Sequence, residues 1–319
     1  MPLLNSCGSH QSKSGPQTPA NYLPQPTHEF GLPAYTFEDE IIRHTAYTLK
    51  YRENCEQAEW VAYKLTAERA SGTYSRTNDF RPDPMVETGS AELSDYRNSG
   101  YDRGHLAPAA DMAWSPTVMS ESFFMSNMSP QRPNFNRGIW KRLEQQVRNW
   151  AKRYEEIYIV TGPVLPDNLP TIGPNRVAVP NYFYKVILDL KPPEVKGIGF
   201  VLANQGSYQG LKTYAVTIDS VETLTGINFF SDLPDPLEMA LESRIESAWT
   251  FDVTSTHPKE ITAPPPKKPP QERDVTVYIT RTGKKYHRGS CGYLHSSRIA
   301  ISKSQAIRRG YTPCSRCRP

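Results

Sequence analysis

Alternating apolar and polar residues predict an antiparallel hairpin near the start of the chain. Residues 44–51 and 58–65 both alternate aromatic or β-branched side chains with polar ones, and a short polar connection separates them, as in two paired strands. Three apolar runs predict further strands, at residues 156–162, 182–188 and 197–203. Residues 220–226 predict a short helix that ends at Gly226.

A longer helix is predicted where four residues recur at every fourth position: Asn136, Trp140, Glu144 and Arg148. Because each such step advances only about 40° around a helix, these side chains share one side. A purely structural interpretation makes Trp140 a core residue and Glu144 and Arg148 a surface ion pair, worth less than about 1 kcal/mol. That interpretation leaves the amide side chains that cluster here unexplained. They belong to Asn127, Gln131, Asn134 and Asn136.

A segment without periodicity, residues 69–100, follows the hairpin and contains Arg76, Phe80 and Arg81. Connections of this length in compact domains are usually functional, so we expect an ordered loop. Taken alone, either arginine is as well explained by a solvated surface charge as by a functional role. Their position shortly before a histidine favours a role with phosphate, which is bound well by guanidinium groups.

Composition indicates one large and one small domain. With 319 residues and 37% hydrophobic residues, the chain can bury one sizeable core and a second unit. Residues 256–272 predict a semi-rigid, Pro-rich linker, and residues 1–34 predict a disordered leader or tether. The domains are therefore expected at residues 35–255 and 273–319.

Positive charge is concentrated in the smaller domain. Residues 271–319 carry eleven Lys and Arg against two Asp and Glu, whereas residues 1–270 carry 26 against 31. General attraction to a polyanion is therefore expected from the tail. No apolar run is long enough to span a membrane.

The first residues leave two interpretations open. Cys7 follows Leu3 and Leu4 as an acylated cysteine follows a bacterial lipoprotein signal, yet the basic and apolar regions of such a signal are missing. Either the signal is truncated and Cys7 is a lipid anchor, or the likeness is accidental. We expect an extracytoplasmic location, secreted or in a bacterial cell envelope.

The candidate chemistry centres on Asp102-Arg103-Gly104-His105. The stretch places a near-neutral base beside a cation, on backbone that can bend closely around a ligand, which suits phosphodiester chemistry. A lone histidine is more often a hydrogen-bonded structural residue. The surrounding motifs change that balance.

Several motifs stand in a characteristic order: Asp102-Arg103-Gly104-His105, Ala107-Pro108, Ser126-Asn127, Pro130-Gln131, Asn136, Trp140, Leu143-Glu144, Arg148 and Thr161-Gly162-Pro163. From about Tyr35 to Pro234 the chain thereby resembles the DNA/RNA non-specific endonuclease family, the ββα-metal or His-Me finger nucleases. The resemblance implies an α+β fold with an antiparallel sheet core. It also implies DNA and RNA substrates, little sequence preference and 5′-phosphorylated products.

The resemblance further implies roles for individual residues. His105 would be the general base, Asn136 the direct protein ligand of Mg²⁺ or Mn²⁺, and Glu144 a carboxylate that holds metal-bound waters. Asn127 would orient the His105 region or the phosphate. The phosphate would be bound by Arg148 and by one arginine of the preceding loop, for which we prefer Arg76 to Arg81. Because the excess positive charge lies in the tail, we expect Arg103 to supply a further local phosphate contact.

The tail carries a second constellation. One nitrogen and three sulfurs, suited to a closed tetrahedral Zn²⁺ site, come from His287, Cys291, Cys314 and Cys317. A strand at residues 275–280 and a helix at residues 302–307 are predicted beside it. The run from Gly310 to Cys317 resembles the end of the zinc-binding module of the Ada DNA-repair protein. His295 is an alternative ligand, and a basic disordered tail with stray cysteines is the competing interpretation.

We therefore predict a Mg²⁺-dependent endonuclease whose basic zinc module binds nucleic acid. Two alternatives stay open. One is a nucleic-acid-binding protein with a decayed nuclease domain, which the intact His105, Asn136 and Glu144 argue against. The other is a phosphodiesterase restricted to one type of nucleic acid.

Overall fold

The computed structural model describes residues 31–251 and 275–319, and the chain divides into two units between Asp252 and Val253. Most of the predicted leader, Cys7 and the predicted linker at residues 256–272 lie outside the described residues. Within the described parts, no helix is long and apolar enough to cross a membrane.

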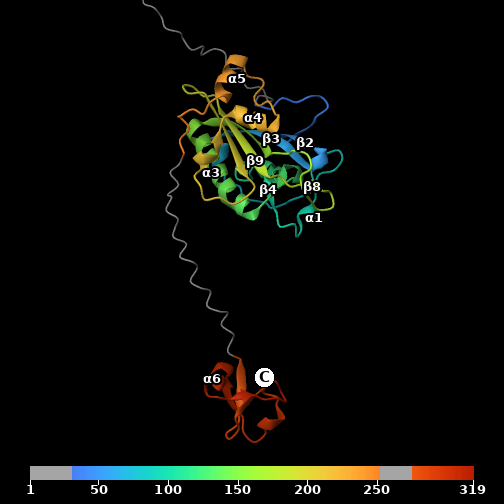
Figure 1. Ribbon diagram of the computed structural model, residues 1–319, viewed down its shortest axis with the longest axis vertical. Coiled ribbons are helices and arrows are strands. Elements are labelled where there is room, and N and C mark those ends of the chain that lie inside the picture. Colours follow the sequence, from blue (N-terminus) through green and yellow to red (C-terminus); the bar gives the residue numbers. More distant parts are fainter. Residues whose placement is uncertain (1–30, 252–274) are drawn as a thin grey trace, which may run out of the picture. The chain divides into compact units, whose positions relative to one another are not determined.

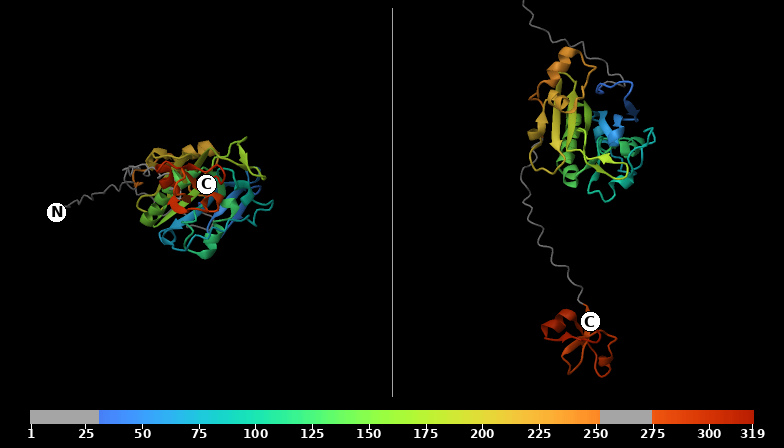
Figure 2. Two further views of the ribbon diagram at one scale, coloured as in Figure 1. Left: turned by 90° about the horizontal axis from the view of Figure 1, so that it is seen from below. Right: turned by 45° about the vertical axis from the view of Figure 1, so that its right-hand side comes forward.

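The larger unit is built on a seven-stranded antiparallel sheet with the order β1-β2-β3-β6-β9-β10-β11 (Figure 1, Figure 2). Its strands are β1 (Glu40–Arg43), β2 (Thr48–Arg52), β3 (Gln57–Thr66), β6 (Glu156–Pro163), β9 (Tyr182–Asp189), β10 (Lys196–Ala203) and β11 (Ala215–Val216). The predicted hairpin is β2–β3, and the three apolar runs are β6, β9 and β10. The prediction missed the edge strands β1 and β11.

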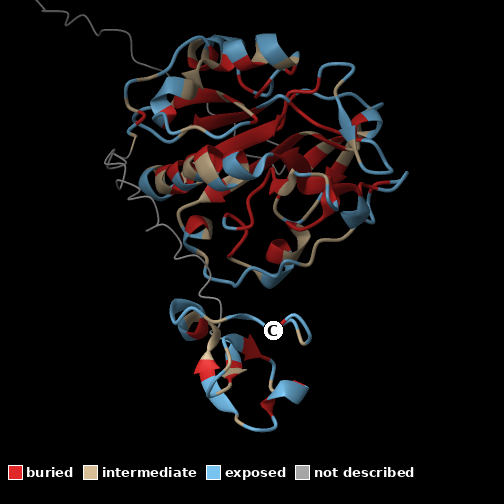
Figure 3. Ribbon diagram, turned by 60° about the horizontal axis from the view of Figure 1, so that its bottom comes forward, coloured by how far each residue is buried: buried red, intermediate tan, exposed pale blue. Residues whose placement is uncertain are grey.

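Helices cover both faces of this sheet because its strands alternate their side chains between two apolar clusters. Ile157 and Ile159 of β6 pack with α3 (Lys141–Tyr154), whereas Tyr158 and Val160 pack with α4 (Ile218–Thr225) and α5 (Asp235–Glu242). The strands are accordingly buried while the helices expose their outer faces (Figure 3). Of these helices, α3 and α4 were predicted and α5 was not.

A separate antiparallel pair, β4 (Asp102–His105) with β5 (Met128–Gln131), carries the central motif. After β5 the chain enters a π-helical segment, Phe135–Trp140, and then α3, which gives the ββα order. Gly104 is required here, because a Cβ at that position would overlap the buried side chain of Gln131. Among residues 31–251, the remaining α-helices and strands are α1 (Leu93–Tyr96), α2 (Pro116–Glu121), β7 (Thr171–Ile172) and β8 (Val177–Ala178).

Two sequence expectations are corrected here. The regular four-residue series from Asn136 is broken, because Gly138 has non-helical backbone angles (φ −105°, ψ −111°) and α3 begins only at Lys141. The leader does not extend to residue 34. Leu32 is buried in the core, and the Ala34 amide donates to the Asn228 carbonyl.

The smaller unit is a four-stranded sheet with the order β14-β12-β13-β15. Its elements are β12 (Thr276–Ile279), β13 (Lys285–His287), β14 (Ile299–Ser302), α6 (Lys303–Arg308) and β15 (Thr312–Pro313). The predicted strand and helix of the tail correspond to β12 and α6. A small apolar core is formed by Val277, Ile279, Tyr286, Ile301 and Ala306.

Candidate active site

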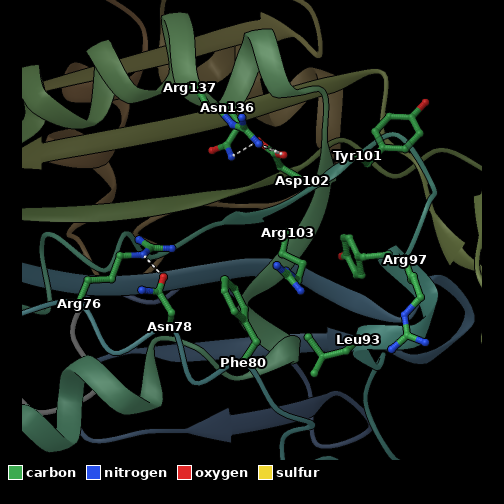
Figure 4. Close-up of a pocket in the computed structure, with 11 residues that line it drawn as sticks. Arg76, Asn78, Phe80, Leu93, Arg97, Tyr101, Asp102, Arg103, Asn136 and Arg137 are labelled. Atoms are coloured by element: carbon green, nitrogen blue, oxygen red, sulfur yellow. Dashed lines mark hydrogen bonds and ion pairs between the residues drawn. The ribbon is translucent and has the colours of Figure 1, made fainter. Parts of the chain in front are cut away.

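A pocket of about 660 Å³ opens beside β4 and the π-helical segment (Figure 4). Its lining comprises Arg76, Asn78, Phe80, Leu93, Tyr96, Arg97, Tyr101, Asp102, Arg103, Asn136 and Arg137. Four of these residues are arginines and one is an acid. The charge balance favours an anionic ligand such as a phosphodiester.

His105 ends β4 directly behind this lining. The residue is only 7% exposed, and its ring packs edge-on against Phe80 and Phe123, with centroids 5.8 and 4.9 Å away. Burial, and then the charges of Arg76 and Arg103, lower the pKa of His105 to about 3. Its Nε2 has no hydrogen-bond partner in the described part of the chain. The imidazole is therefore neutral near pH 7, and its Nε2 is not engaged by another group of the described residues.

Two arginines are held beside His105 by aromatic rings. The Arg103 guanidinium lies 4.2 Å from the centre of the Phe80 ring, and that of Arg76 lies 4.7 Å from the centre of the Phe123 ring. Arg81 points elsewhere and donates to Asp79 and to the Ser120 carbonyl. Of the two loop arginines left open by the sequence, the structure thus brings Arg76 to the pocket.

Asn136 is oriented by Asp102 at the opposite side of the pocket. Its Nδ2 donates to Asp102 Oδ2 at 2.9 Å, and Arg137 binds both oxygens of the same carboxylate. The amide oxygen consequently turns away from Asp102 (Figure 4). Throughout residues 31–251 and 275–319, no group donates a hydrogen bond to this oxygen. A free amide oxygen in a polar pocket fits a hard divalent cation.

Arg148 is committed to a buried ion pair. Its Nη1 lies 2.7 Å from Asp111 Oδ1, and the Tyr63 hydroxyl donates to the other oxygen of Asp111. The interpretation of Glu144 and Arg148 as a surface ion pair is therefore wrong. It fails because this side of α3 packs onto β3 and the segment after β4. A phosphate contact by Arg148 stays a prediction.

Glu144 is influenced electrostatically by Lys185, a residue that was not singled out from the sequence. Lys185 is fully buried, its Nζ lies 5.0 Å from the centre of the Trp140 ring, and it has no hydrogen-bond partner among the described residues. Burial raises the pKa of the Glu144 carboxyl, and the Lys185 charge opposes that rise most strongly. The available signal was a single lysine inside the apolar run of β9.

The Asn127 side chain uses its amide groups in hydrogen bonds to the backbone. It is completely buried; its Oδ1 accepts from the Ala107 amide, and its Nδ2 donates to the carbonyls of Ala107 and Ser122. Ala107 is two residues beyond His105. The geometry matches orientation of the His105 region and leaves no atom for phosphate.

The smaller unit gathers the four predicted zinc ligands. One ligand atom from each of His287, Cys291, Cys314 and Cys317 lies within 4.8 Å of the others, and His287 Nδ1 is 3.3 Å from Cys291 Sγ. Tetrahedral coordination by one imidazole and three thiolates requires comparable spacings, so these residues fit Zn²⁺. His295 lies outside the group and bonds the Gly292 carbonyl.

The ββα order and this cationic pocket define a nuclease of the ββα type. The chain belongs to the DNA/RNA non-specific endonuclease family, whose model matches residues 24–236. It is accordingly an enzyme that hydrolyses nucleic acids. The match ends before the smaller unit begins.

Individual relatives agree with this assignment. Mitochondrial endonuclease G from Bos taurus is 32% identical over 248 residues, covering 73% of this chain and 82% of that protein. A nuclease from Nostoc sp. is 32% identical over 225 residues, covering 66% and 81%. A solved structure described as a complex of EndoG with EndoGI, concerning EndoG inhibition, has a TM-score of 0.58 at 33% identity and covers 62% of this chain and 88% of its own.

Proposed function

We propose that the chain is a Mg²⁺-dependent endonuclease that cuts DNA and RNA with little sequence preference. The observation that carries this proposal is the neutral, buried imidazole of His105 with its free Nε2 beside two arginines. A base in this state can take the proton of an attacking water. Arginines fixed on aromatic rings can bind the scissile phosphate without reading the bases.

Asn136, with Glu144 holding coordinated waters, would bind the cation. When bound, Mg²⁺ would stabilise the charge on the phosphate and on the leaving oxygen. Asp102 keeps the Asn136 amide turned so that its oxygen is available, and Arg137 holds Asp102 in place.

The test is cleavage of plasmid DNA and of structured RNA by wild type, His105→Ala and Asn136→Ala. We expect cleavage of both substrates with Mg²⁺, none with EDTA, and recovery with excess Mg²⁺ but not with Zn²⁺. His105→Ala should lower kcat about 10²–10⁴-fold, whereas His295→Ala, an exposed histidine of the smaller unit, should not. Failure of wild type to cut either substrate would exclude this function, and cleavage of RNA alone would favour the restricted phosphodiesterase.

We propose that the smaller unit binds Zn²⁺ and the nucleic-acid backbone. Residues 275–319 carry ten Lys and Arg and no Asp or Glu, so phosphate contacts would face no repulsion. Deletion of residues 271–319 should raise KM and flatten the salt dependence of kcat/KM. If both quantities are unchanged, the unit does not bind substrate.

The extracytoplasmic location and the lipid anchor at Cys7 stay proposals, to be tested by cell fractionation and fatty-acid labelling.

A further inference from the structure

Two acidic helix faces meet on the side of the sheet opposite α3. Asp219 and Glu222 are three residues apart on α4, and Glu238 and Glu242 are four apart on α5, so each pair shares a face. One carboxylate oxygen from each of Asp219, Glu222 and Glu242 lies within 4.8 Å of the other two. Like charges at this spacing repel and destabilise the packing of α4 on α5 unless they are neutralised.

The lack of a neutralising partner is most unfavourable at Glu242. Its side chain is 5% exposed, and its Oε1 has no hydrogen-bond partner among the described residues. Burial first, and then Glu222, Glu238 and Asp219, raise the pKa of Glu242 to about 8. Within the described segments, none of these four carboxylates forms an ion pair with Lys, Arg or His. A buried carboxylate without a cation or a donor is strongly unfavourable.

The same three residues are arranged as oxygen ligands. Glu222 Oε1 accepts from the Phe229 amide at 2.7 Å, which fixes the carboxylate and leaves its second oxygen available. Glu242 is the last residue of α5, where the helix dipole favours a cation. Asp219 is exposed and Glu222 half-buried, so a cation can enter from solvent.

We propose that Asp219, Glu222 and Glu242 bind a hard divalent cation, Ca²⁺ by preference, that joins α4 to α5. Several carboxylates with flexible spacing and no nitrogen or sulfur donor suit Ca²⁺, which accepts six to eight oxygen ligands, better than a transition metal. The site is structural. None of its residues lines the catalytic pocket, and α4 and α5 pack in a different apolar cluster from α3.

The competing explanation is a protonated Glu242 that shares its proton with a neighbouring carboxylate. Glu242→Gln separates the two explanations, because glutamine mimics the protonated acid but is a poor ligand. In calcium-free buffer the variant should be at least as stable as wild type under either explanation. Only the cation site makes the wild type respond to calcium through this residue.

The test measures Tm of the full chain at pH 7.5 with and without 10 mM CaCl₂, and calcium stoichiometry by titration calorimetry. For a dissociation constant of about 10⁻⁴–10⁻³ M, wild type should gain about 3–10 °C. Glu242→Gln should lose this gain and one calorimetric site. Asp235→Asn removes an exposed charge from the same helix and should retain both. MgCl₂ in place of CaCl₂ should give a smaller gain.

Asn136→Ala distinguishes calcium bound at the catalytic pocket from calcium bound between α4 and α5. This variant should keep the gain in Tm that depends on Glu242. Asp219→Asn, at an exposed ligand, should weaken calcium binding at least tenfold and serves if Glu242→Gln does not fold. A wild-type Tm indifferent to calcium, or an equal gain in wild type and Glu242→Gln, would overturn the proposal. Neither readout uses nuclease activity, so the outcome is independent of the proposed function.

Discussion

At the scale of single residues, the environment of His105 keeps its imidazole neutral near pH 7. The ring is buried between two phenylalanines, and two guanidinium groups stand beside it. Both burial and like charge oppose its protonation. Because these surroundings lower the pKa of His105 in the folded protein, the residue makes the free energy of unfolding depend on pH.

His105→Gln should reduce that dependence. In unfolded chains histidine titrates near pH 6.5, whereas the pKa of folded His105 is lowered to about 3, so its stabilisation is complete above pH 6.5 and is lost as pH falls below it. Between pH 7.5 and pH 5, wild type should lose about 2 kcal/mol more than the variant. Urea unfolding followed by tryptophan fluorescence measures this, since all five tryptophans precede Asp252. An equal loss in both proteins would contradict the buried, neutral imidazole.

Sequence reasoning named candidate residues that stand in a local motif, and missed residues whose interactions depend on long-range packing. His105, Arg103 and Asn136 stand in recognisable order along the chain. Lys185 and Asp111 do not, because their partners are 41 and 37 residues away in the sequence, at Glu144 and Arg148. Only the sheet brings β9 beneath α3.

At the scale of elements, β9 carries the Lys185 charge, which acts electrostatically on Glu144 of α3. Lys185→Met keeps the volume and removes a buried ammonium that has no hydrogen-bond partner. The pKa of Glu144 should then rise further, because its main opposing charge is lost. We expect kcat/KM near pH 7 to fall about tenfold for each unit of that rise and to recover partly at pH 8.5.

The matched control for this substitution is Lys191→Met, at an exposed lysine that follows the same strand. Its activity should equal that of wild type at both pH values. If Lys185→Met is as active as wild type at pH 7, Lys185 has no part in the state of Glu144. A uniform loss without recovery at high pH would indicate misfolding instead.

Elements with strong periodicity were predictable, and irregular ones were not. The β2–β3 hairpin follows from residue alternation, and the strands β6, β9 and β10 follow from their apolar runs. The π-helical segment could not be predicted in this way. The residues on either side of Gly138 keep a regular spacing in the sequence, but the non-helical backbone at Gly138 changes the directions of their side chains around the helix axis. Short edge strands such as β1 contain too few residues to show a period.

At the scale of the whole molecule, composition predicted two domains, and the structure divides into two units between Asp252 and Val253. The predicted leader ran too far, because Leu32 belongs to the core of the larger unit. The smaller unit has only five residues in its main apolar cluster. Units of this size rarely fold on hydrophobic burial alone. Its stability should therefore depend on coordination of Zn²⁺ by His287, Cys291, Cys314 and Cys317.

Removal of zinc should unfold the smaller unit and leave the larger one intact. Calorimetry of the full chain should lose one transition after chelation and regain it with Zn²⁺, while tryptophan fluorescence stays unchanged. Cys317→Ser should behave like the chelated protein, and Cys55→Ser, at a buried cysteine of the larger unit, should not. A transition that survives chelation would show that the unit folds without metal.

The two arginines beside His105 have one more consequence. They depress the basicity of the imidazole only while their charges are uncompensated. Under the proposed function, a phosphodiester bound between Arg76 and Arg103 would cancel much of that field, so the part of the pKa lowering that is due to their charges would be relieved when a scissile bond is present, whereas the larger effect of burial would persist. His105 would thus be a stronger base in the proposed substrate complex than in the empty pocket.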